Sequence, residues 1–180
     1  MGASAHLVPD EGSYLLEYRQ FRERLIKLRR VWEEFTKTGQ VTEPEALKPE
    51  VLASWKRCRA RMLDPYDSPN MVSLSPDELK NRLEEYRQVI GIATPFLQAL
   101  ARSVQGSGFR IDFFDRELFL LAQYGDEEAL REAKEHGSTP GVSRSEINCG
   151  TSAVNLAARL QQPVQLVGPE HYKVALHYWT

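Results

Sequence analysis

The first strong pattern in the chain is a regular spacing of apolar side chains between Ser13 and about Lys37. Successive apolar positions alternate four and three residues apart, which predicts one long amphipathic helix with a heptad seam. The seam positions are Tyr14, Tyr18, Phe21, Leu25, Leu28, Trp32 and Phe35. Two interpretations follow. The helix packs on its own domain, or Tyr18, Phe21, Leu25, Leu28 and Trp32 pair it with a second copy in a homodimer.

Two more helical patterns follow the first. One begins at Pro49, a residue that suits the first helical position, and ends at Leu63-Asp64-Pro65. The other begins at Ser75, which forms a capping-box pattern with Glu78. Gly91 and Pro95 are expected to interrupt it, and its apolar pattern resumes up to Gly106. Residues 13–106 are therefore expected to be mainly helical, with a turn-rich loop at residues 67–70.

At Phe109 the apolar period changes from that of a helix to two. Apolar residues alternate with charged ones up to Phe113, and a second apolar segment runs from Leu118 to Tyr124. This pattern predicts a β-hairpin that turns at residues 115–117, although the turn has no glycine to set its geometry. A charged helix is expected next, from residue 126 to about residue 136.

The segment from Ser145 to the end of the chain predicts a helix, a strand and a further helix. Gly150-Thr151 precedes an apolar helical pattern that Pro163 ends. Residues 164–167 are expected to form a third strand, and residues 168–172 to lead into another helix. Together these elements predict an α+β fold: an N-terminal helical region, then an antiparallel sheet flanked by helices.

Composition indicates an ordinary globular protein. Apolar residues make up 42% of the 180 residues, and the formal net charge is −2. No apolar run approaches the roughly 20 residues needed to span a bilayer, and residues 1–9 show no secretory signal. Two cysteines are too few for a disulfide framework. We expect a cytoplasmic protein with a flexible tail at residues 1–12, no direct nucleic-acid binding and no membrane partner.

Candidate binding residues of several chemical types gather in the last segment. Cys149 directly precedes the expected helix start, where backbone N–H groups can stabilise a thiolate, although a buried inert thiol is the commoner case. Thr151 and Ser152 cap the helix or bind a ligand, and Glu146 is either a hydrogen-bond acceptor for a ligand or an ordinary solvated side chain. The candidate ligand-binding residues are Glu146, Cys149, Thr151, Ser152, His171 and Tyr172.

Metal binding and catalysis are not expected. His171 and His177 are six residues apart, so on a helix they point about 120° away from each other. The chain has no phosphate-binding glycine loop, no nucleophile elbow and no His-Glu-x-x-His motif. We therefore expect a site that holds a small molecule without a cofactor or metal. Trp55 and Cys58 are expected to pack, and the basic runs on the first two helices to form a solvated face or meet an acidic partner domain.

Two separated groups of residues resemble one family of regulators. The downstream pieces are Ser145-Glu146, Gly150-Thr151-Ser152-Ala153, Pro163-Val164-Gln165, Gly168-Pro169-Glu170-His171-Tyr172 and His177-Tyr178-Trp179-Thr180. The upstream pieces are Ser54-Trp55-Lys56-Arg57-Cys58-Arg59 and Leu63-Asp64-Pro65. In these residues the chain resembles the N-terminal sensor region of acetoin-regulator-like sigma-54-dependent transcriptional activators.

The resemblance implies a GAF-type ligand-sensing domain, followed in the family by an ATPase domain and a helix-turn-helix domain. The resemblance covers roughly Val51 to the end of the chain. Together with the helical patterns, it leads us to expect an N-terminal helical region at residues 13–74 and a GAF-like sensor domain at residues 75–180 without its last two strands. It also implies a small oxygenated metabolite, such as an acetoin-like compound, as the ligand. The competing interpretations are a ligand-independent dimerisation module, a sensor attached to another signalling output, and a GAF-type methionine sulfoxide reductase, which requires paired thiols.

Overall fold

The long first helix is present in the computed structural model, which describes residues 11–178, with side chains from residue 17. Helix α1 spans Glu11–Thr38, so the predicted tail lies outside the described residues except at its last two positions. Leu28, Trp32 and Phe35 are buried in the chain's own core, whereas Tyr18 and Phe21 are 62% and 42% exposed. Leu28 and Trp32, two of the candidate seam residues, thus pack within this chain. Dimerisation through the exposed end of α1 stays a prediction.

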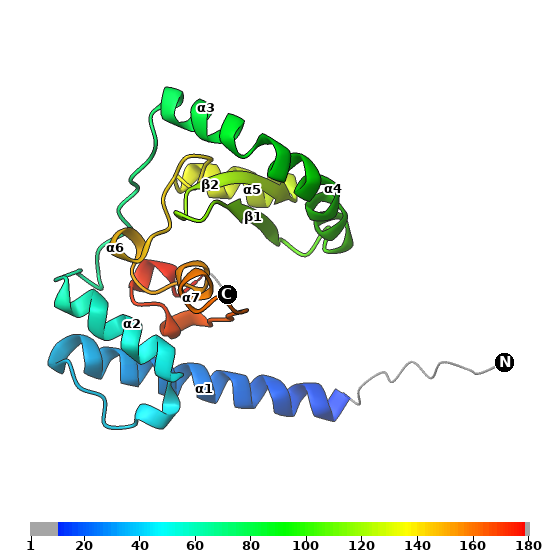
Figure 1. Cartoon of the computed structure of the whole chain (residues 1–180). Helices are drawn as coiled ribbons and strands as arrows, with labels where there is room; N and C mark the ends of the chain where they lie inside the picture. Colours follow the sequence, from blue (N-terminus) through cyan, green and yellow to red (C-terminus); the bar gives the residue numbers. More distant parts are fainter. Residues whose placement is uncertain (1–10, 179–180) are drawn as a thin grey trace.

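Helix α2 (Pro49–Ala60) follows a short 3-10 turn (η1, Pro44–Ala46) and lies along α1 (Figure 1). The Phe35 and Trp55 rings meet with centroids 5.3 Å apart. The Arg59 guanidinium lies over the Phe35 ring and donates to the Phe35 and Thr36 carbonyls. The two helices thus share an aromatic core, as the predicted packing of Trp55 requires.

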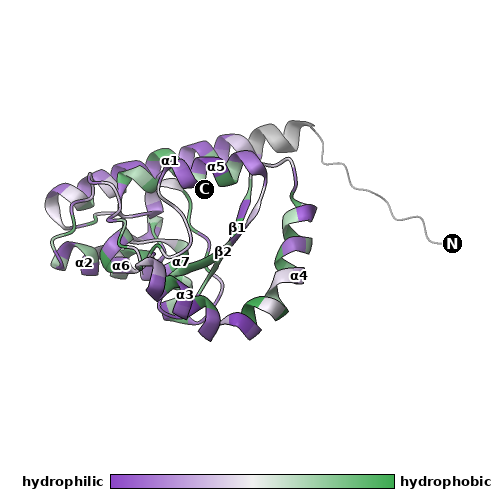
Figure 2. Ribbon diagram, turned by 90° about the horizontal axis from the view of Figure 1, so that it is seen from above, coloured by the Kyte–Doolittle hydropathy of each residue, from purple (hydrophilic) through white to green (hydrophobic). Residues whose placement is uncertain are grey.

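A second layer holds α3 (Pro76–Glu85), α4 (Arg87–Ser103), the antiparallel strands β1 (Arg110–Phe114) and β2 (Leu120–Gly125), and α5 (Glu127–Glu135). The predicted Ser75–Glu78 capping box is confirmed, and so is the hairpin. Helices α3 and α4 lie on one side of the hairpin and α5 on the other (Figure 1). Figure 2 shows hydrophobic positions recurring along α4, where Ile92 and Phe96 are 70% and 72% exposed.

The hairpin turns without a glycine because Asp115 organises it. This buried carboxylate accepts hydrogen bonds through Oδ1 from the backbone N–H groups of Glu117 and Phe119, both at 2.9 Å. Leu118 adopts a positive φ of 68° between them. Arg82 of α3 donates to the other carboxylate oxygen at 3.0 Å, which attaches the turn to the helical layer.

The C-terminal segment differs from the prediction. It forms α6 (Glu146–Cys149), α7 (Ala153–Leu160) and two 3-10 turns, η2 (Gly168–Glu170) and η3 (Val174–Leu176). The third strand at residues 164–167 is wrong, as is the helix after residue 172; among the described residues the named sheet has two strands. Leu166 is buried and Gln165 exposed, which mimics a strand. However, the Val167 N–H donates to the Glu170 carboxylate instead of to a neighbouring strand.

The main hydrophobic core joins the two ends of the chain. Leu156, Leu166 and Tyr172 pack with the buried side chains of α1 and α2. The α+β class is confirmed. The predicted boundary between residues 74 and 75 stays a prediction, but residues from α6 onward pack against the N-terminal helices. No described helix combines the length and apolar character needed to cross a membrane.

Candidate functional site

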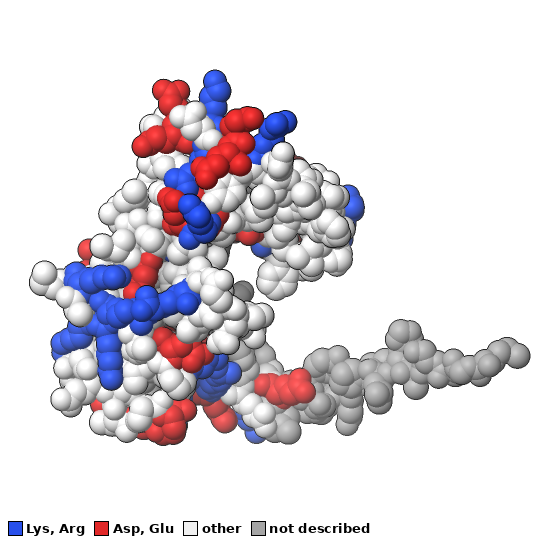
Figure 3. All heavy atoms as spheres, viewed as in Figure 1, with Lys and Arg blue, Asp and Glu red and all other residues white. Residues whose placement is uncertain are grey.

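A cavity of about 450 Å³ lies between strand β1, the loop at residues 68–71 and the segment from Cys149 to Leu176. This volume falls in the range of small-molecule sites in proteins. The face shown in Figure 3 is hollowed between the layer that carries α3 and α4 and the layer that carries α2 and α7. Apolar side chains form much of the lining, including Met71, Phe114, Val154 and Leu176.

Three of the six candidate ligand-binding residues line this cavity: Cys149, Ser152 and His171. Glu146, Thr151 and Tyr172 do not line it, and each makes hydrogen bonds within the protein instead. Whether the three lining residues bind a ligand stays a prediction.

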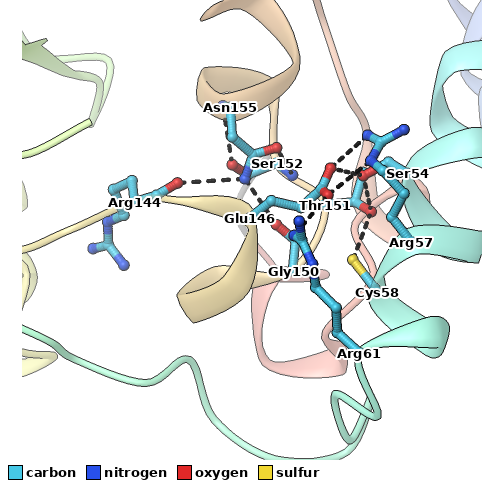
Figure 4. A network of polar contacts seen from close by, with 10 residues as sticks. All are labelled: Ser54, Arg57, Cys58, Arg61, Arg144, Glu146, Gly150, Thr151, Ser152 and Asn155. Atoms are coloured by element: carbon cyan, nitrogen blue, oxygen red, sulfur yellow. Dashed lines mark hydrogen bonds and ion pairs between the residues drawn. The ribbon is translucent and has the colours of Figure 1, made fainter. Parts of the chain in front are cut away.

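Glu146 connects α6 to α2 (Figure 4). Its carboxylate accepts hydrogen bonds from Ser54 Oγ at 2.8 Å and from Arg57 Nε and Nη2 at 2.8 and 2.5 Å, and Arg61 Nη1 lies 3.4 Å away. Burial alone would raise the pKa of Glu146. The hydrogen bonds from Arg57 and Ser54, with the charges of Arg57 and Arg61, outweigh burial and hold this pKa below its usual 4.5.

The buried Thr151 hydroxyl extends the same network. It lies 2.8 Å from Ser54 Oγ and 3.7 Å from Cys58 Sγ. Gly150 precedes it with φ +68°, and a Cβ there would lie 3.1 Å from the Tyr172 Cβ. Glycine is therefore required at this turn, both for its backbone conformation and for the close approach of Tyr172.

Ser152 is the N-cap of α7, so the predicted capping role belongs to Ser152. It forms a capping box with Asn155, whose side chain also donates to the Gly150 and Arg144 carbonyls. Helix α7 therefore begins two residues later than the Gly150-Thr151 pattern indicated. The Ser152 side chain serves both as a cap and as part of the cavity wall.

Cys149 does not sit at a helix start. It is the last residue of α6 and is buried. Burial raises the pKa of the Cys149 thiol, and the nearby Arg144 guanidinium reduces this effect without reversing it. Of the two alternatives for Cys149, the structure favours the buried thiol. Cys58 is also buried, and burial raises its pKa to about 11.

The Gly168–Tyr172 motif attaches the C-terminal segment to α1 and α2. The Trp32 and Trp55 indole N–H groups donate to the carbonyls of Tyr172 and Glu170 at 2.8 and 2.9 Å. The fully buried Glu170 carboxylate pairs with Arg24 of α1 at 3.3 Å. Tyr172 is buried and donates through its hydroxyl to the Leu63 carbonyl at 3.1 Å. These contacts explain the upstream and downstream matched residues as a single structural unit.

The two histidines have separate environments. His171 is buried against the cavity, and its Nδ1 lies 3.0 Å from the Gly168 carbonyl. The Nε2 of His177 lies 3.1 Å from the His171 carbonyl, and its ring packs edge-on against Trp32. Burial lowers the pKa of both, that of His177 to about 4. Among residues 11–178, no group of three or more His, Cys, Asp or Glu side chains is placed to hold a metal ion.

Sequence reasoning missed the polar wall of the cavity, which consists of Arg110, Asp112, Ser138 and Arg144. Arg144 directly precedes the matched Ser145-Glu146 pair, and Arg110 and Asp112 stand at alternate positions of the predicted hairpin strand. The alternation placed Arg110 and Asp112 on the same face of the strand. It indicated a cavity wall only weakly, because alternation does not reveal which face of a strand meets a cavity.

The comparisons with known proteins agree with the predicted resemblance. Over 149 residues the chain is 29% identical to the acetoin dehydrogenase operon transcriptional activator AcoR of Bacillus subtilis, covering 83% of this chain and 24% of AcoR. The resemblance to acetoin-regulator-like transcriptional activators is confirmed. A signal-transduction and transcriptional-control protein of Clostridium beijerinckii is 28% identical over 107 residues, covering 59% of this chain and 17% of that protein. This chain thus spans about a quarter of the length of AcoR and a smaller share of the Clostridium protein. No protein-family model matches it.

Among solved structures, the chain is similar to one chain of the crystal structure of the E. coli DhaR(N)–DhaL complex. The TM-score is 0.69 at 19% sequence identity, over 72% of this chain and 44% of that one. At this identity the likeness shows a shared fold. The relatives named above are thus transcriptional regulators, and the solved structure has the same fold as this chain.

Proposed function

We propose that this region is the small-molecule input region of a cytoplasmic, sigma-54-dependent transcriptional activator, and that it senses its signal without catalysis. The observation that carries the proposal is the cavity between β1 and the Cys149–Leu176 segment, lined by Cys149, Ser152 and His171. The similarity to AcoR supports a role in transcription. The GAF-type assignment, the homodimer, and the ATPase and DNA-binding domains elsewhere in the activator belong to the same proposal.

The position of the cavity suits regulation because its walls belong to different parts of the chain. The loop residue Arg144 lines it, and two residues later Glu146 of α6 binds Arg57 of α2. A ligand that contacts the cavity differently in two states would shift their populations, and only this difference in affinity regulates. A displacement of Arg144 on ligand binding would pass through α6 to α2 and α1.

A non-enzymatic role is proposed because the cavity lacks paired thiols. Cys149 is the one cysteine among the described lining residues. Cys58 is on α2, where its thiol forms a hydrogen bond with the Thr151 hydroxyl. A methionine sulfoxide turnover assay tests this point. Turnover that is lost in Cys149→Ser would establish an enzyme instead.

An interaction module is the second candidate, because Tyr18 and Phe21 on α1 and Ile92 and Phe96 on α4 are exposed. Contiguous exposed apolar side chains often mark interaction sites. In this alternative, side chains would fill the cavity on association and no ligand would be needed.

A thermal-shift screen of small metabolites, neutral and charged, tests the proposal. We expect a saturable rise in Tm for one chemical class, by mass action on the folded state. Val154→Trp, which fills the cavity, is expected to abolish the rise, and Arg159→Gln, an exposed change on the same helix, to leave it unchanged. A cooperative melt that no compound shifts would favour the interaction module.

A further inference from the structure

The polar wall of the cavity brings two guanidinium groups to one buried hydroxyl. Ser138 Oγ lies 2.6 Å from Arg144 Nη2 and 3.5 Å from Arg110 Nη2, and Ser138 is only 2% exposed. Arg110 also pairs with Asp112 through Nε at 2.8 Å. Among the described residues that line the cavity, the Lys, Arg, Asp and Glu side chains are Arg110, Arg144 and Asp112, two positive and one negative. The described part of the lining therefore has an excess positive charge.

Arg144 is the source of that excess. Besides Ser138, its guanidinium meets two sulfur atoms, Met71 Sδ and Cys149 Sγ, each 3.8 Å from Nη1. Sulfur is a weak acceptor, and a guanidinium has five N–H donors. No carboxylate among the described residues forms an ion pair with Arg144. Figure 4 shows its guanidinium turned away from the Glu146 network. The Glu146 carboxylate, two residues away in sequence, pairs with Arg57 and Arg61 instead.

We infer that the cavity binds a small carboxylate with an apolar body, and that Arg144 anchors its carboxylate group. A planar guanidinium matches a carboxylate with two parallel hydrogen bonds. The apolar lining, with Phe114, Val154 and Leu176, suits a hydrocarbon or aromatic body. A single unpaired guanidinium balances the one negative charge of a carboxylate better than the two of a phosphate. This inference rests on the proposed function and replaces a neutral acetoin-like ligand with an anion.

Isothermal titration of the whole 180-residue chain tests the inference with matched probes. Hexanoate and benzoate are compared with hexanamide, benzamide, hexan-1-ol and benzyl alcohol, and with inorganic phosphate. We expect at least one carboxylate to bind at least about 10-fold more tightly than its amide and alcohol, since a charge-assisted pair is roughly twice as strong as a neutral one. This comparison needs no variant, so it stands whether or not a variant folds.

Two substitutions locate the anchor. Arg144→Gln is expected to erase the preference for carboxylate over amide, and Arg144→Lys to keep part of it, because lysine retains the charge but loses the planar fork. Arg159→Gln, an exposed arginine of α7, is the matched control and should leave the preference intact. Near-ultraviolet circular dichroism verifies the fold of each variant.

Other outcomes overturn the inference in distinguishable ways. Equal binding of amide and carboxylate would remove the anion class, and a preference that survives in a folded Arg144→Gln variant would remove the anchor. Phosphate binding as tight as carboxylate would make this a general anion site. Failure of all these probes, with neutral hits in the metabolite screen, would overturn the carboxylate but leave the proposed function standing. A screen without any hit would overturn both.

Discussion

At the scale of single residues, Glu146 illustrates how one carboxylate can stabilise a fold beside a cavity without entering it. It was a candidate ligand group, but its oxygens accept from Ser54 and Arg57, and its side chain is only 12% exposed. A carboxylate held this way is stabilised in its charged form. The stability of the protein should therefore depend on pH through this residue.

We predict that Glu146→Gln lowers the free energy of unfolding by about 1–3 kcal/mol at pH 7, because the partly buried Arg57 and the buried Ser54 lose a charged acceptor. Since the folded pKa lies below the unfolded value of 4.5, the contribution is complete above that value and is lost as pH falls through the folded pKa. Urea titrations at pH 7, 5 and 3 should show a constant difference between the two proteins above about pH 5 that narrows below about 4.5.

Glu128→Gln is the matched control, because the Glu128 side chain is 85% exposed in its pair with Arg131. Its effect should stay below about 0.5 kcal/mol at every pH. A Glu146→Gln difference that stays constant down to pH 3 would mean that the charge of Glu146 contributes nothing.

At the scale of elements, α1 has two different halves. Toward its C-terminal end, Leu28, Val31, Trp32 and Phe35 form part of the core, while Phe21 and Ile26 are exposed by 42% and 59%. The heptad spacing continues through both halves, so the period alone did not show where the helix leaves its own domain. An exposed half with the same spacing is consistent with contact to a partner helix. One substitution in each half distinguishes the role of the buried half from that of the exposed half.

We predict that Leu28→Ala lowers the free energy of unfolding by about 2–5 kcal/mol, as expected for a truncated core leucine. Phe21→Ala should change it by less than about 0.5 kcal/mol when measured on the monomer at low concentration. Chemical denaturation gives both values, and light scattering gives the mass. Loss of a dimer in Phe21→Ala with an unchanged monomer fold would establish the dimer seam on the exposed half. A large loss of monomer stability in Phe21→Ala would contradict the division.

At the scale of the whole molecule, the cavity lies where the hairpin layer meets the C-terminal segment, and that segment is attached to α1 and α2. Figure 3 shows Lys and Arg side chains gathered over the α2 part of the face, whereas both charges mix over α3. Arg57 of α2 and Arg61, which directly follows α2, bind Glu146. Under the proposed function, a ligand signal would therefore have a physical route from the cavity to the N-terminal helices.

Hydrogen exchange tests this route. We predict that a compound found by the metabolite screen slows amide exchange in β1, Cys149 and residues 152–154, which line the cavity, and also in α2 through Glu146. In Glu146→Gln the protection of β1 should remain and that of α2 should fall. Equal protection of α2 in both proteins would show that the coupling bypasses Glu146.

The sequence predicted those parts of the fold that local patterns determine. The Ser75 capping box and the hairpin depend on neighbouring residues, and both are present. The prediction of a third strand failed because buried Leu166 beside exposed Gln165 imitates a strand pattern. In the structure the Gln165 carbonyl accepts from Lys48, and the Val167 N–H donates to the nearby Glu170 carboxylate. In the site, Cys149, Ser152 and His171 line the cavity as grouped, but Arg144 was missed because long-range folding determines the direction of a loop side chain.

The two indole hydrogen bonds of Trp32 and Trp55 have a spectroscopic consequence. Both rings are fully buried on the N-terminal helices, and both donate to carbonyls of the C-terminal segment. Detachment of that segment would hydrate both rings at once and shift their fluorescence emission to the red. The fluorescence of Trp32 and Trp55 would therefore report whether the C-terminal segment is packed on α1 and α2. Release of the segment by a ligand could be followed in real time without any label.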